Sequence, residues 1–99
     1  MSGESGTIEV LLLTQAHCGF CEQAEALLER LRHEYPLSIT HLDLASPEGE
    51  ALAMRHHVLF APGILLDGAF FSYGRPSERR LRQELDRRCA RGEWAGPHP

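Results

Sequence analysis

The chain has 99 residues, which is enough for one small domain with a modest hydrophobic core. Hydrophobic residues make up 42% of it, which excludes a disordered polypeptide, and apolar runs such as Val10–Leu13 are far shorter than the ~20 residues that span a membrane. The formal net charge is −4, and the arginine-rich stretch at residues 75–91 has no interleaved aromatic residues, which favours a solvated helix face over a nucleic-acid surface.

The first half of the chain predicts two strands and two helices in alternation. The apolar segment at residues 7–13 is typical of a central strand that is covered on both faces. Apolar residues then recur at helical spacing over residues 18–34, and apolar and polar residues alternate over residues 37–44, as in a half-buried strand. A serine N-cap followed by proline starts a short helix at residues 46–57.

The second half predicts a hairpin and a last helix. Asp67 and Gly68 indicate a type I′ turn between strands at residues 62–66 and 69–73, because both central residues of that turn need positive φ. Pro76 is expected at the first position of the last helix, where its missing N–H does no harm.

Taken together, the elements follow the order β-α-β-α-β-β-α. Two parallel strands joined by a right-handed crossover and followed by a hairpin predict an α/β fold: a four-stranded mixed sheet with helices on both faces. We expect one domain at residues 7–91, between a flexible N-terminus at residues 1–6 and a C-terminal tail at residues 92–99. The first residues do not resemble a secretory signal, so we expect a cytoplasmic protein.

A C-x-x-C motif, Cys18-Gly19-Phe20-Cys21, follows the first predicted strand and opens the first predicted helix. The free N–H groups and the positive dipole end of a helix N-terminus stabilise a thiolate, so Cys18 is the expected nucleophile. Cys21 lies one helical turn further on the core-facing stripe and is expected to resolve a mixed disulfide formed at Cys18. Gly19 leaves the approach open, and Phe20 is expected to be an apolar surface contact for a partner.

Three other groups near or beyond the motif need an interpretation. His17 is either a cation that lowers the pKa of Cys18 or simply an exposed side chain beside it. Cys89 is either a regulatory thiol or a small core residue at the end of an apolar helical stripe. His56 and His57 are adjacent rather than at the spacing of zinc ligands, so neither a metal nor another cofactor is expected.

The run VLLLTQAHCGFC, a lone proline that opens the hairpin strand, and LLDG followed by YGRPSERRLRQEL resemble the thioredoxin fold and, within it, glutaredoxins. The resemblance covers about residues 7–90. It implies a thiol–disulfide oxidoreductase in which Cys18 attacks and Cys21 resolves. It also implies a cis-proline, Pro62, that faces the two cysteines, and a backbone segment at Ala61 that is offered to an extended substrate.

Departures from glutathione-using glutaredoxins bear on the electron donor. Those proteins carry a basic residue shortly before the motif, where this chain has Gln15. The run Gly74-Arg75-Pro76 is similar to the Gly-x-Arg-Pro of glutaredoxin-like proteins that thioredoxin reductase reduces, which makes Arg75 a candidate contact. The resemblance therefore implies a thioredoxin-reductase-type flavoprotein rather than glutathione. We expect a monomer that acts on a disulfide-containing client protein, without nucleic acid or membrane.

Three functional hypotheses remain. The first is a small dithiol–disulfide oxidoreductase or electron donor, which Cys21 favours because a resolving thiol serves no obvious purpose in a cluster carrier. The second is an iron–sulfur or metal-binding module that uses Cys18, because Cys-Gly-Phe also matches monothiol glutaredoxins, although these have Ser at the position of Cys21. The third is a redox-inactive binding domain, against which the intact C-x-x-C argues.

Overall fold

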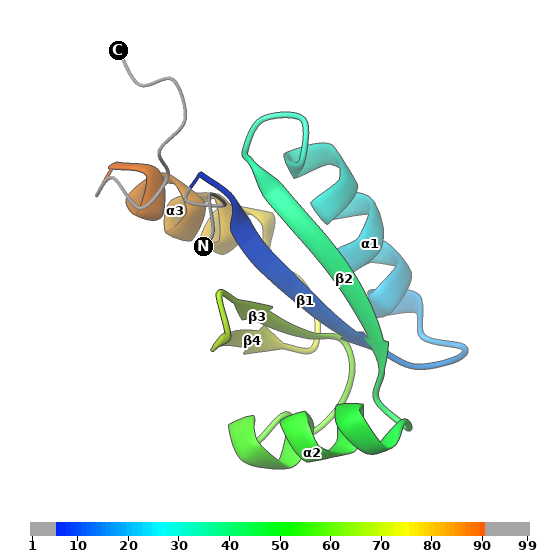
Figure 1. Cartoon of the computed structure of the whole chain (residues 1–99). Coiled ribbons are helices and arrows are strands. Elements are labelled where there is room, and N and C mark those ends of the chain that lie inside the picture. The colour runs from blue at the N-terminus through cyan, green and yellow to red at the C-terminus, as the bar shows by residue number, and fades with distance from the viewer. Residues whose placement is uncertain (1–5, 91–99) are drawn as a thin grey trace.

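The computed structural model describes residues 6–90. These residues form four strands and three helices in the predicted order (Figure 1). The elements are β1 (Ile8–Thr14), α1 (Gly19–Leu31), β2 (Leu37–Asp43), α2 (Pro47–His56), β3 (Gly63–Leu66), β4 (Ala69–Tyr73) and α3 (Glu78–Ala90). The N-terminal segment predicted at residues 1–6, apart from its last residue, and the tail predicted at residues 92–99 lie outside the described part of the chain.

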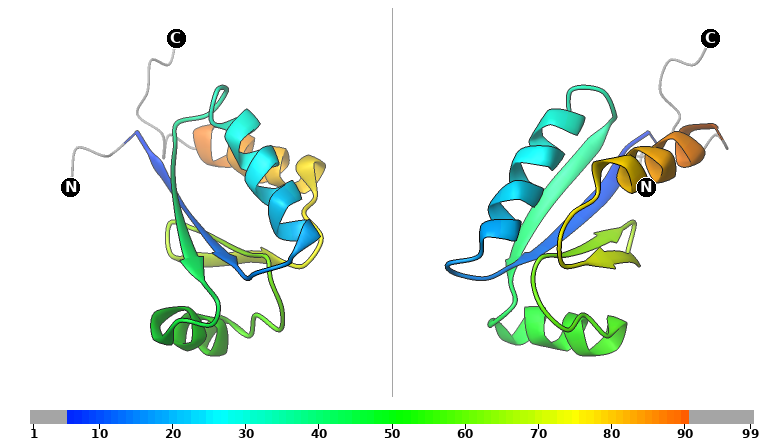
Figure 2. Two further views of the ribbon diagram at one scale, coloured as in Figure 1. Left: turned by 90° about the vertical axis from the view of Figure 1, so that its right-hand side faces the viewer. Right: turned by 180° about the vertical axis from the view of Figure 1, so that it is seen from behind.

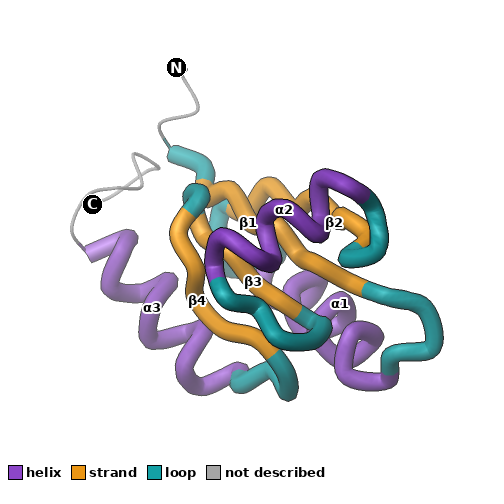
Figure 3. Tube along the Cα trace, turned by 90° about the horizontal axis from the view of Figure 1, so that it is seen from below, coloured by secondary structure: helices purple, strands orange, loops and turns teal. Residues whose placement is uncertain are grey.

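The strands form one mixed sheet in the order β2-β1-β3-β4. β1 pairs in parallel with β2 and antiparallel with β3, and β4 is the antiparallel partner of β3 at the sheet edge. α1 and α3 cover one face of the sheet, and α2 lies across the other (Figure 2, Figure 3). The predicted fold class is therefore confirmed. None of the helices in residues 6–90 is long and apolar enough to cross a membrane.

The two faces of the sheet are packed unequally. The core between the sheet, α1 and α3 consists of buried aliphatic residues: Ile8, Val10, Leu12, Ala24, Leu27, Leu28, Leu31, Leu37, Ile64, Leu66, Leu81 and Leu85. The core on the α2 face has three buried members, Leu13, Val58 and Leu65. Gly49 is the residue that α2 itself buries within the described range. Helix α2 is thus attached to the sheet by a much smaller apolar contact than α1 and α3.

Helix α2 is held against the end of β2 by its first turn. The Ser46 hydroxyl accepts a hydrogen bond from the Gly49 N–H at 3.0 Å and donates one to the Asp43 carbonyl at 2.6 Å. A Cβ atom at Gly49 would lie 2.0 Å from that same carbonyl oxygen. The close approach of helix and strand therefore requires glycine at this position, and Ser46 is the N-cap that the sequence predicted.

The first helix is shorter than the spacing of apolar residues predicted. It ends at Leu31 rather than near residue 34, and the following residues form a turn in which the Tyr35 N–H donates to the Leu31 carbonyl at 2.9 Å. The physical reason is Pro36, which keeps Tyr35 out of the helical region, so the chain leaves the helix before it reaches the proline.

The start of the last helix corrects the sequence prediction. Pro76 is not its first residue: α3 begins at Glu78, and the Ser77 hydroxyl accepts a hydrogen bond from the Arg80 N–H at 3.2 Å. A serine hydroxyl can satisfy a free N–H at the helix start, which proline cannot do, so the N-cap position goes to Ser77. Pro76 belongs to the connection before the helix.

The hairpin turn forms as predicted. Asp67 has a φ of 51° and Gly68 a φ of 83°, the positive values that a type I′ turn needs. The Asp67 carboxylate accepts a hydrogen bond from the Glu9 N–H at 2.9 Å and pairs with Arg88 at 2.9 Å. The turn is thereby tied both to β1 and to α3.

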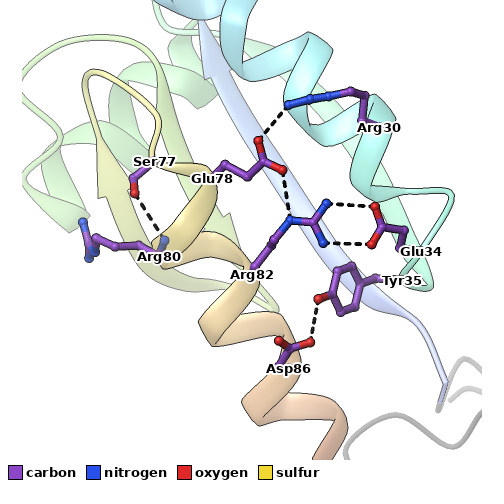
Figure 4. Close-up of polar contacts among 8 residues, drawn as sticks. All are labelled: Arg30, Glu34, Tyr35, Ser77, Glu78, Arg80, Arg82 and Asp86. Carbon is purple, nitrogen blue, oxygen red and sulfur yellow. Dashed lines mark hydrogen bonds and ion pairs between the residues drawn. The ribbon is translucent and has the colours of Figure 1, made fainter.

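Charged side chains join α3 to the end of α1 (Figure 4). The Arg82 guanidinium binds both carboxylate oxygens of Glu34 at 2.8 Å and one of Glu78 at 2.9 Å. The Tyr35 hydroxyl donates to Asp86 at 2.5 Å. These contacts complement the apolar packing and keep α3, and the connection that precedes it, beside α1.

Candidate active site

Cys18 is the N-cap residue of α1. Its backbone is extended, with a φ of −120° and a ψ of 103°, and its sulfur accepts a hydrogen bond from the Cys21 N–H at 3.1 Å. The Cys18 carbonyl also accepts from the N–H groups of Cys21 and Glu22, at 3.1 and 3.2 Å, which begins the helix. The sulfur therefore lies where helix N–H groups and the helix dipole stabilise negative charge.

The two cysteines of the motif are joined as a disulfide, with their Cα atoms 5.2 Å apart. Cys21 is 3% exposed and faces the core, whereas Cys18 is partly exposed. This difference in accessibility agrees with the sequence analysis, which placed Cys21 on the core-facing stripe. A thiol of a partner can therefore reach Cys18 much more easily than Cys21.

The peptide bond between Ala61 and Pro62 is cis, as the resemblance to glutaredoxins implied, and both residues are buried. In the sheet register Leu13 pairs with Gly63, so Pro62 lies at the end of β1 from which the chain continues to Cys18. The Pro62 carbonyl accepts a hydrogen bond from the Gly74 N–H at 2.7 Å. The cis-proline segment is thus attached to the connection between β4 and α3.

That connection in turn lies beside α1. Pro76 and Glu78 line a hollow together with Gln23 and Leu27 of α1. The loop from β1 to α1, the segment before β3 and the connection after β4 all lie at one end of the sheet (Figure 2). Arg75, the candidate partner contact, is exposed within this connection.

The other predicted contact residues surround Cys18 in the sequence and are exposed. His17 has a positive φ of 56° and an exposed side chain, and Phe20 is 43% exposed. A Cβ atom added at Gly19 would meet no atom within 4 Å, so the space in front of Gly19 is open. These positions leave His17, Gly19 and Phe20 accessible to a partner.

Sequence reasoning gave no role to Leu59 and Phe60, which directly precede the cis-proline segment. Leu59 is 73% exposed and Phe60 53% exposed. The Phe60 ring packs edge-on against Tyr73, with ring centroids 5.0 Å apart, and lies over Gly74. The sequence feature that could have indicated them is their apolar character, because they lie outside any predicted helix or strand and directly before Ala61 and Pro62.

The third cysteine has a different environment. Cys89 is a free thiol in α3 and is half-buried. Burial raises the pKa of this thiol, and the neighbouring Asp86 carboxylate raises it further. A raised pKa lowers the thiolate fraction at neutral pH, which distinguishes Cys89 from the C-x-x-C pair.

Within residues 6–90, no group of three or more His, Cys, Asp and Glu side chains is placed to hold a metal ion. None of the charged or polar residues in that range is buried, so no buried carboxylate lies behind the cysteine pair there.

Comparison with known families identifies the domain. A family profile described as a glutaredoxin-like domain matches residues 9–86, which is most of the chain. The chain belongs to the glutaredoxin-like domain family. No curated protein matches the sequence.

Solved structures show that this glutaredoxin-like domain has the thioredoxin fold. A thioredoxin-like protein from Clostridium perfringens has a TM-score of 0.72 at 13% identity, over 98% of this chain and 81% of that chain. A thioredoxin from Thermus thermophilus has a TM-score of 0.61 at 23% identity, over 93% and 81%. A mutant thioredoxin from Halobacterium salinarum has a TM-score of 0.63 at 23% identity, over 81% and 73%. The fold and the cysteine pair together support a redox role.

Proposed function

We propose that the protein is a small dithiol–disulfide oxidoreductase, or electron donor, that reduces disulfides of client proteins. The observation that supports this most strongly is the pairing of an accessible sulfur at the start of α1, on Cys18, with a buried sulfur one turn later, on Cys21. A nucleophile has to be exposed and stabilised as a thiolate, whereas a resolving thiol only has to reach the first sulfur.

The proposed reaction has two exchange steps. The Cys18 thiolate attacks one sulfur of the client disulfide, and the other client sulfur leaves as a thiolate. Cys21 then loses its proton to solvent and attacks the Cys18 sulfur, which forms the Cys18–Cys21 disulfide and releases the second client thiolate. The client gains two electrons and the protein loses two, so each turnover needs a two-electron supply, from one dithiol or from two monothiols, to restore the cysteine pair.

The surrounding residues have proposed roles in binding the client. The segment at Ala61 and Pro62 lies at the end of β1, and its backbone is the proposed edge for an extended client segment. His17, Gly19 and Phe20 provide the exposed surface next to Cys18. The exposed Phe20 ring adds apolar contact area, and the open space at Gly19 lets a client chain approach the sulfur.

We further propose that a thioredoxin-reductase-type flavoprotein, rather than glutathione, supplies the electrons. Glutathione has two carboxylates, and the segment from Thr14 to His17, which leads to the nucleophile, contains no lysine or arginine. Arg75 is exposed and is the candidate contact for the reductase or for one carboxylate. The protein would act as a monomer in a reducing compartment such as the cytoplasm.

Trapping of mixed disulfides tests the central proposal. Cys21→Ala should accumulate mixed disulfides with client proteins, because the thiol that releases them is missing, and Cys18→Ala should accumulate none. Non-reducing electrophoresis followed by mass spectrometry measures both. Cys89→Ala is the matched control and should retain disulfide reductase activity.

Two results would contradict this assignment. Loss of turnover in Cys89→Ala would show that the working cysteine pair is wrong. A brown protein as purified, whose colour depends on Cys18 and not on Cys21, would instead support the alternative of an iron–sulfur module.

A further inference from the structure

Strand β2 forms an open edge of the sheet, because β1 is its only neighbouring strand within residues 6–90. Just beyond its end, the Leu44 N–H donates to the Thr14 carbonyl of β1 at 2.7 Å. The direction of the backbone N–H and C=O groups alternates along a strand, so those of Ile39 and His41 point away from β1. Together these two residues offer two donors and two acceptors to an incoming strand.

The two edges of the sheet differ in how well they can accept a further strand. The pairing of β4 with β3 shifts its register between Ile64 and Leu65, and an irregularity of this kind blunts an edge. β2 keeps a regular register with β1 over its seven residues and contains no proline, lysine or arginine, residues that commonly protect an edge. β2 is therefore the edge that remains open to pairing.

A hollow of about 400 Å³ lies beside β2 on the face that α1 covers. It is lined by residues of α1 and β2: Glu22, Glu25, Ala26, Glu29, Ile39 and His41. The charge of Glu29 is compensated by an ion pair with Arg32. Glu22 and Glu25 are exposed, and no residue of the described chain pairs with either. Their two carboxylates are thus available to a cation of a partner.

A second hollow, of about 430 Å³, lies beside β2 on the opposite face, next to α2. Its apolar lining comes from both strands and the helix: Leu11, Leu42, Ala51 and Leu52. Glu48 and Arg55 also line it, and their charges have opposite signs. This hollow therefore suits an uncharged aliphatic side chain.

The two hollows are placed to receive alternate residues of one extended chain. Ile39 and His41 line the hollow on the α1 face, whereas Thr40 and Leu42 line the hollow on the α2 face. Helices α1 and α2 lie on opposite faces of the sheet (Figure 3). Successive side chains of a strand also point to opposite faces, so a strand added beside β2 directs them in turn to one hollow and to the other.

We propose that the edge of β2 docks an extended segment of a partner protein in which basic residues alternate with aliphatic residues. The backbone of the segment bonds to Ile39 and His41, its lysine or arginine side chains lie beside Glu22 and Glu25, and its aliphatic side chains enter the hollow next to α2. Addition of a strand to an edge takes its affinity from backbone hydrogen bonds and its specificity from such alternate sites. This docking is separate from the exchange at Cys18 and goes beyond the proposed function.

Charge favours such a partner over a second copy of this chain. Antiparallel pairing of β2 with β2 of another copy would place both α1 helices on the same face of the joined sheet. The unpaired carboxylates of Glu22 and Glu25 from the two copies would then lie side by side, and like charges across an interface oppose association. A basic segment meets no such repulsion.

Binding of dye-labelled peptides without cysteine tests the proposal, because no disulfide exchange takes part. One peptide has lysine and valine in alternation, and a second has the same residues with all lysines at one end. Fluorescence anisotropy should show that the wild-type protein binds the alternating peptide about tenfold more tightly, the factor expected for partial burial of one aliphatic side chain. Equal affinity for the two peptides would show attraction by charge alone and overturn the proposal.

Two variants of His41 separate the backbone from the side chain. His41→Pro removes an N–H that points away from β1 and should abolish the preference for the alternating peptide, whereas His41→Ala keeps this N–H and should retain the preference. In the wild-type protein, the amide NMR signals of Ile39 and His41 should shift on addition of the alternating peptide, which tests the edge without any substitution. Unchanged signals, or an equal loss in both variants, would contradict docking at this edge.

Further variants test the two hollows, each with a control at an exposed residue that lines neither. Glu25→Lys should weaken binding about three- to tenfold, because an attraction between exposed charges becomes a repulsion, and Glu50→Lys should not. Ala51→Trp should fill the hollow next to α2 and remove the preference for the alternating peptide, and Ala45→Trp should keep it. Equal effects in a variant and its control would refute the role of that hollow.

Sedimentation of the protein without peptide examines the alternative occupant. We expect one species with the mass of a single chain at all concentrations. A dimer that forms in the wild type and in His41→Ala but not in His41→Pro would show that a second copy occupies the edge, and the proposed partner would then be wrong.

Discussion

At the scale of single residues, one sulfur combines two roles. Cys18 provides the N-cap of α1 through its sulfur, a position that serine, threonine or aspartate usually occupies. The hydrogen bond from the Cys21 N–H that caps the helix is also the bond that would stabilise a Cys18 thiolate. Helix formation and the proposed activation of the Cys18 thiol are therefore linked, because both depend on the same N–H group.

The first prediction follows from this position. In the reduced protein, we expect the pKa of Cys18 to lie well below the ~8.5 of a free cysteine. Thiols at helix N-termini have pKa values of roughly 3.5–7.5. We expect the upper part of this range, because the carboxylates of Glu22 and Glu25 are close in the sequence and disfavour a thiolate. The measurement is the rate of alkylation against pH in Cys89→Ala, with Cys21→Ala as a second background. A Cys18 that titrates like a free thiol would contradict it.

At the scale of elements, the contact between α1 and α3 depends on charge as well as on packing. The hydrogen bond from Arg82 holds the pKa of both Glu34 and Glu78 below the usual value of a glutamate. Burial and the hydrogen bond to Asp86 raise the pKa of Tyr35 to about 12. Glu34 and Glu78 are exposed, whereas Arg82 and Tyr35 are half-buried. The ion pairs of the exposed carboxylates therefore contribute little to stability and are screened by salt.

The second prediction concerns the pH range in which these contacts stabilise the fold. A carboxyl group whose folded pKa is lowered contributes above its unfolded pKa of about 4.3 and loses that contribution as the pH falls further. Arg82→Gln should therefore lower the urea midpoint at pH 7 and leave it almost unchanged near pH 3. Equal effects at both pH values would show that Arg82 acts through packing.

The stabilisation from Tyr35 has the opposite pH dependence, and this gives the third prediction. Its raised pKa means that stabilisation is complete below the unfolded value of about 10 and is lost as the pH rises toward 12. Tyr35→Phe should remove that alkaline loss, measured as the urea midpoint between pH 9 and pH 11. A wild-type midpoint that falls no more steeply than that of Tyr35→Phe would contradict the assignment.

The attachment of α2 gives the fourth prediction. Gly49→Ala would place a Cβ atom 2.0 Å from the Asp43 carbonyl oxygen, so helix and strand would have to separate. Steric overpacking of this kind costs about 1–3 kcal/mol of unfolding free energy. Gly19→Ala is the matched control, because its Cβ atom meets nothing within 4 Å. Thermal denaturation compares the two, and equal melting temperatures would show that α2 moves freely.

At the scale of the whole molecule, the fold gathers three segments that are far apart in the sequence. The loop before Cys18, the segment at Ala61 and Pro62, and the connection at residues 74–76 lie at one end of the sheet (Figure 2). The arginine-rich helix α3 is far from the C-x-x-C motif in the sequence. Two of its arginines, Arg82 and Arg87, are paired with carboxylates. The pairing reduces the positive charge that this helix presents to a nucleic acid.

The fifth prediction is the source of electrons. With NADPH and a thioredoxin reductase, the protein should reduce client disulfides, and with NADPH, glutathione and glutathione reductase it should do so much more slowly. The loss of one charge-assisted contact to a glutathione carboxylate corresponds to about ten- to a hundredfold in affinity. The measurement is NADPH consumption in the two coupled assays. Efficient turnover only with glutathione would make the protein a glutathione-dependent enzyme instead.

Much of the fold could be predicted because its signals are local. The order of elements, the turn at Asp67 and Gly68, and the N-cap at Ser46 all follow from spacing, positive-φ preference or capping within a few residues. The same holds for the opposite exposure of Cys18 and Cys21, because helical spacing alone places one at the start and the other on the inner face. The helix ends were less predictable: a serine next to Pro76 decided where α3 begins.

The relations between segments that are distant in the sequence were decided only by the tertiary structure. Composition and spacing alone do not pair Leu13 with Gly63, and this pairing brings Pro62 to the end of β1. Nor do they show that Glu25 and His41 line one hollow, because that depends on how α1 packs beside β2. The sequence by itself was enough to propose the chemistry of the cysteine pair, since that chemistry depends on one helix terminus. The surface that a client meets depends on the packing of several elements, and only the folded chain defines it.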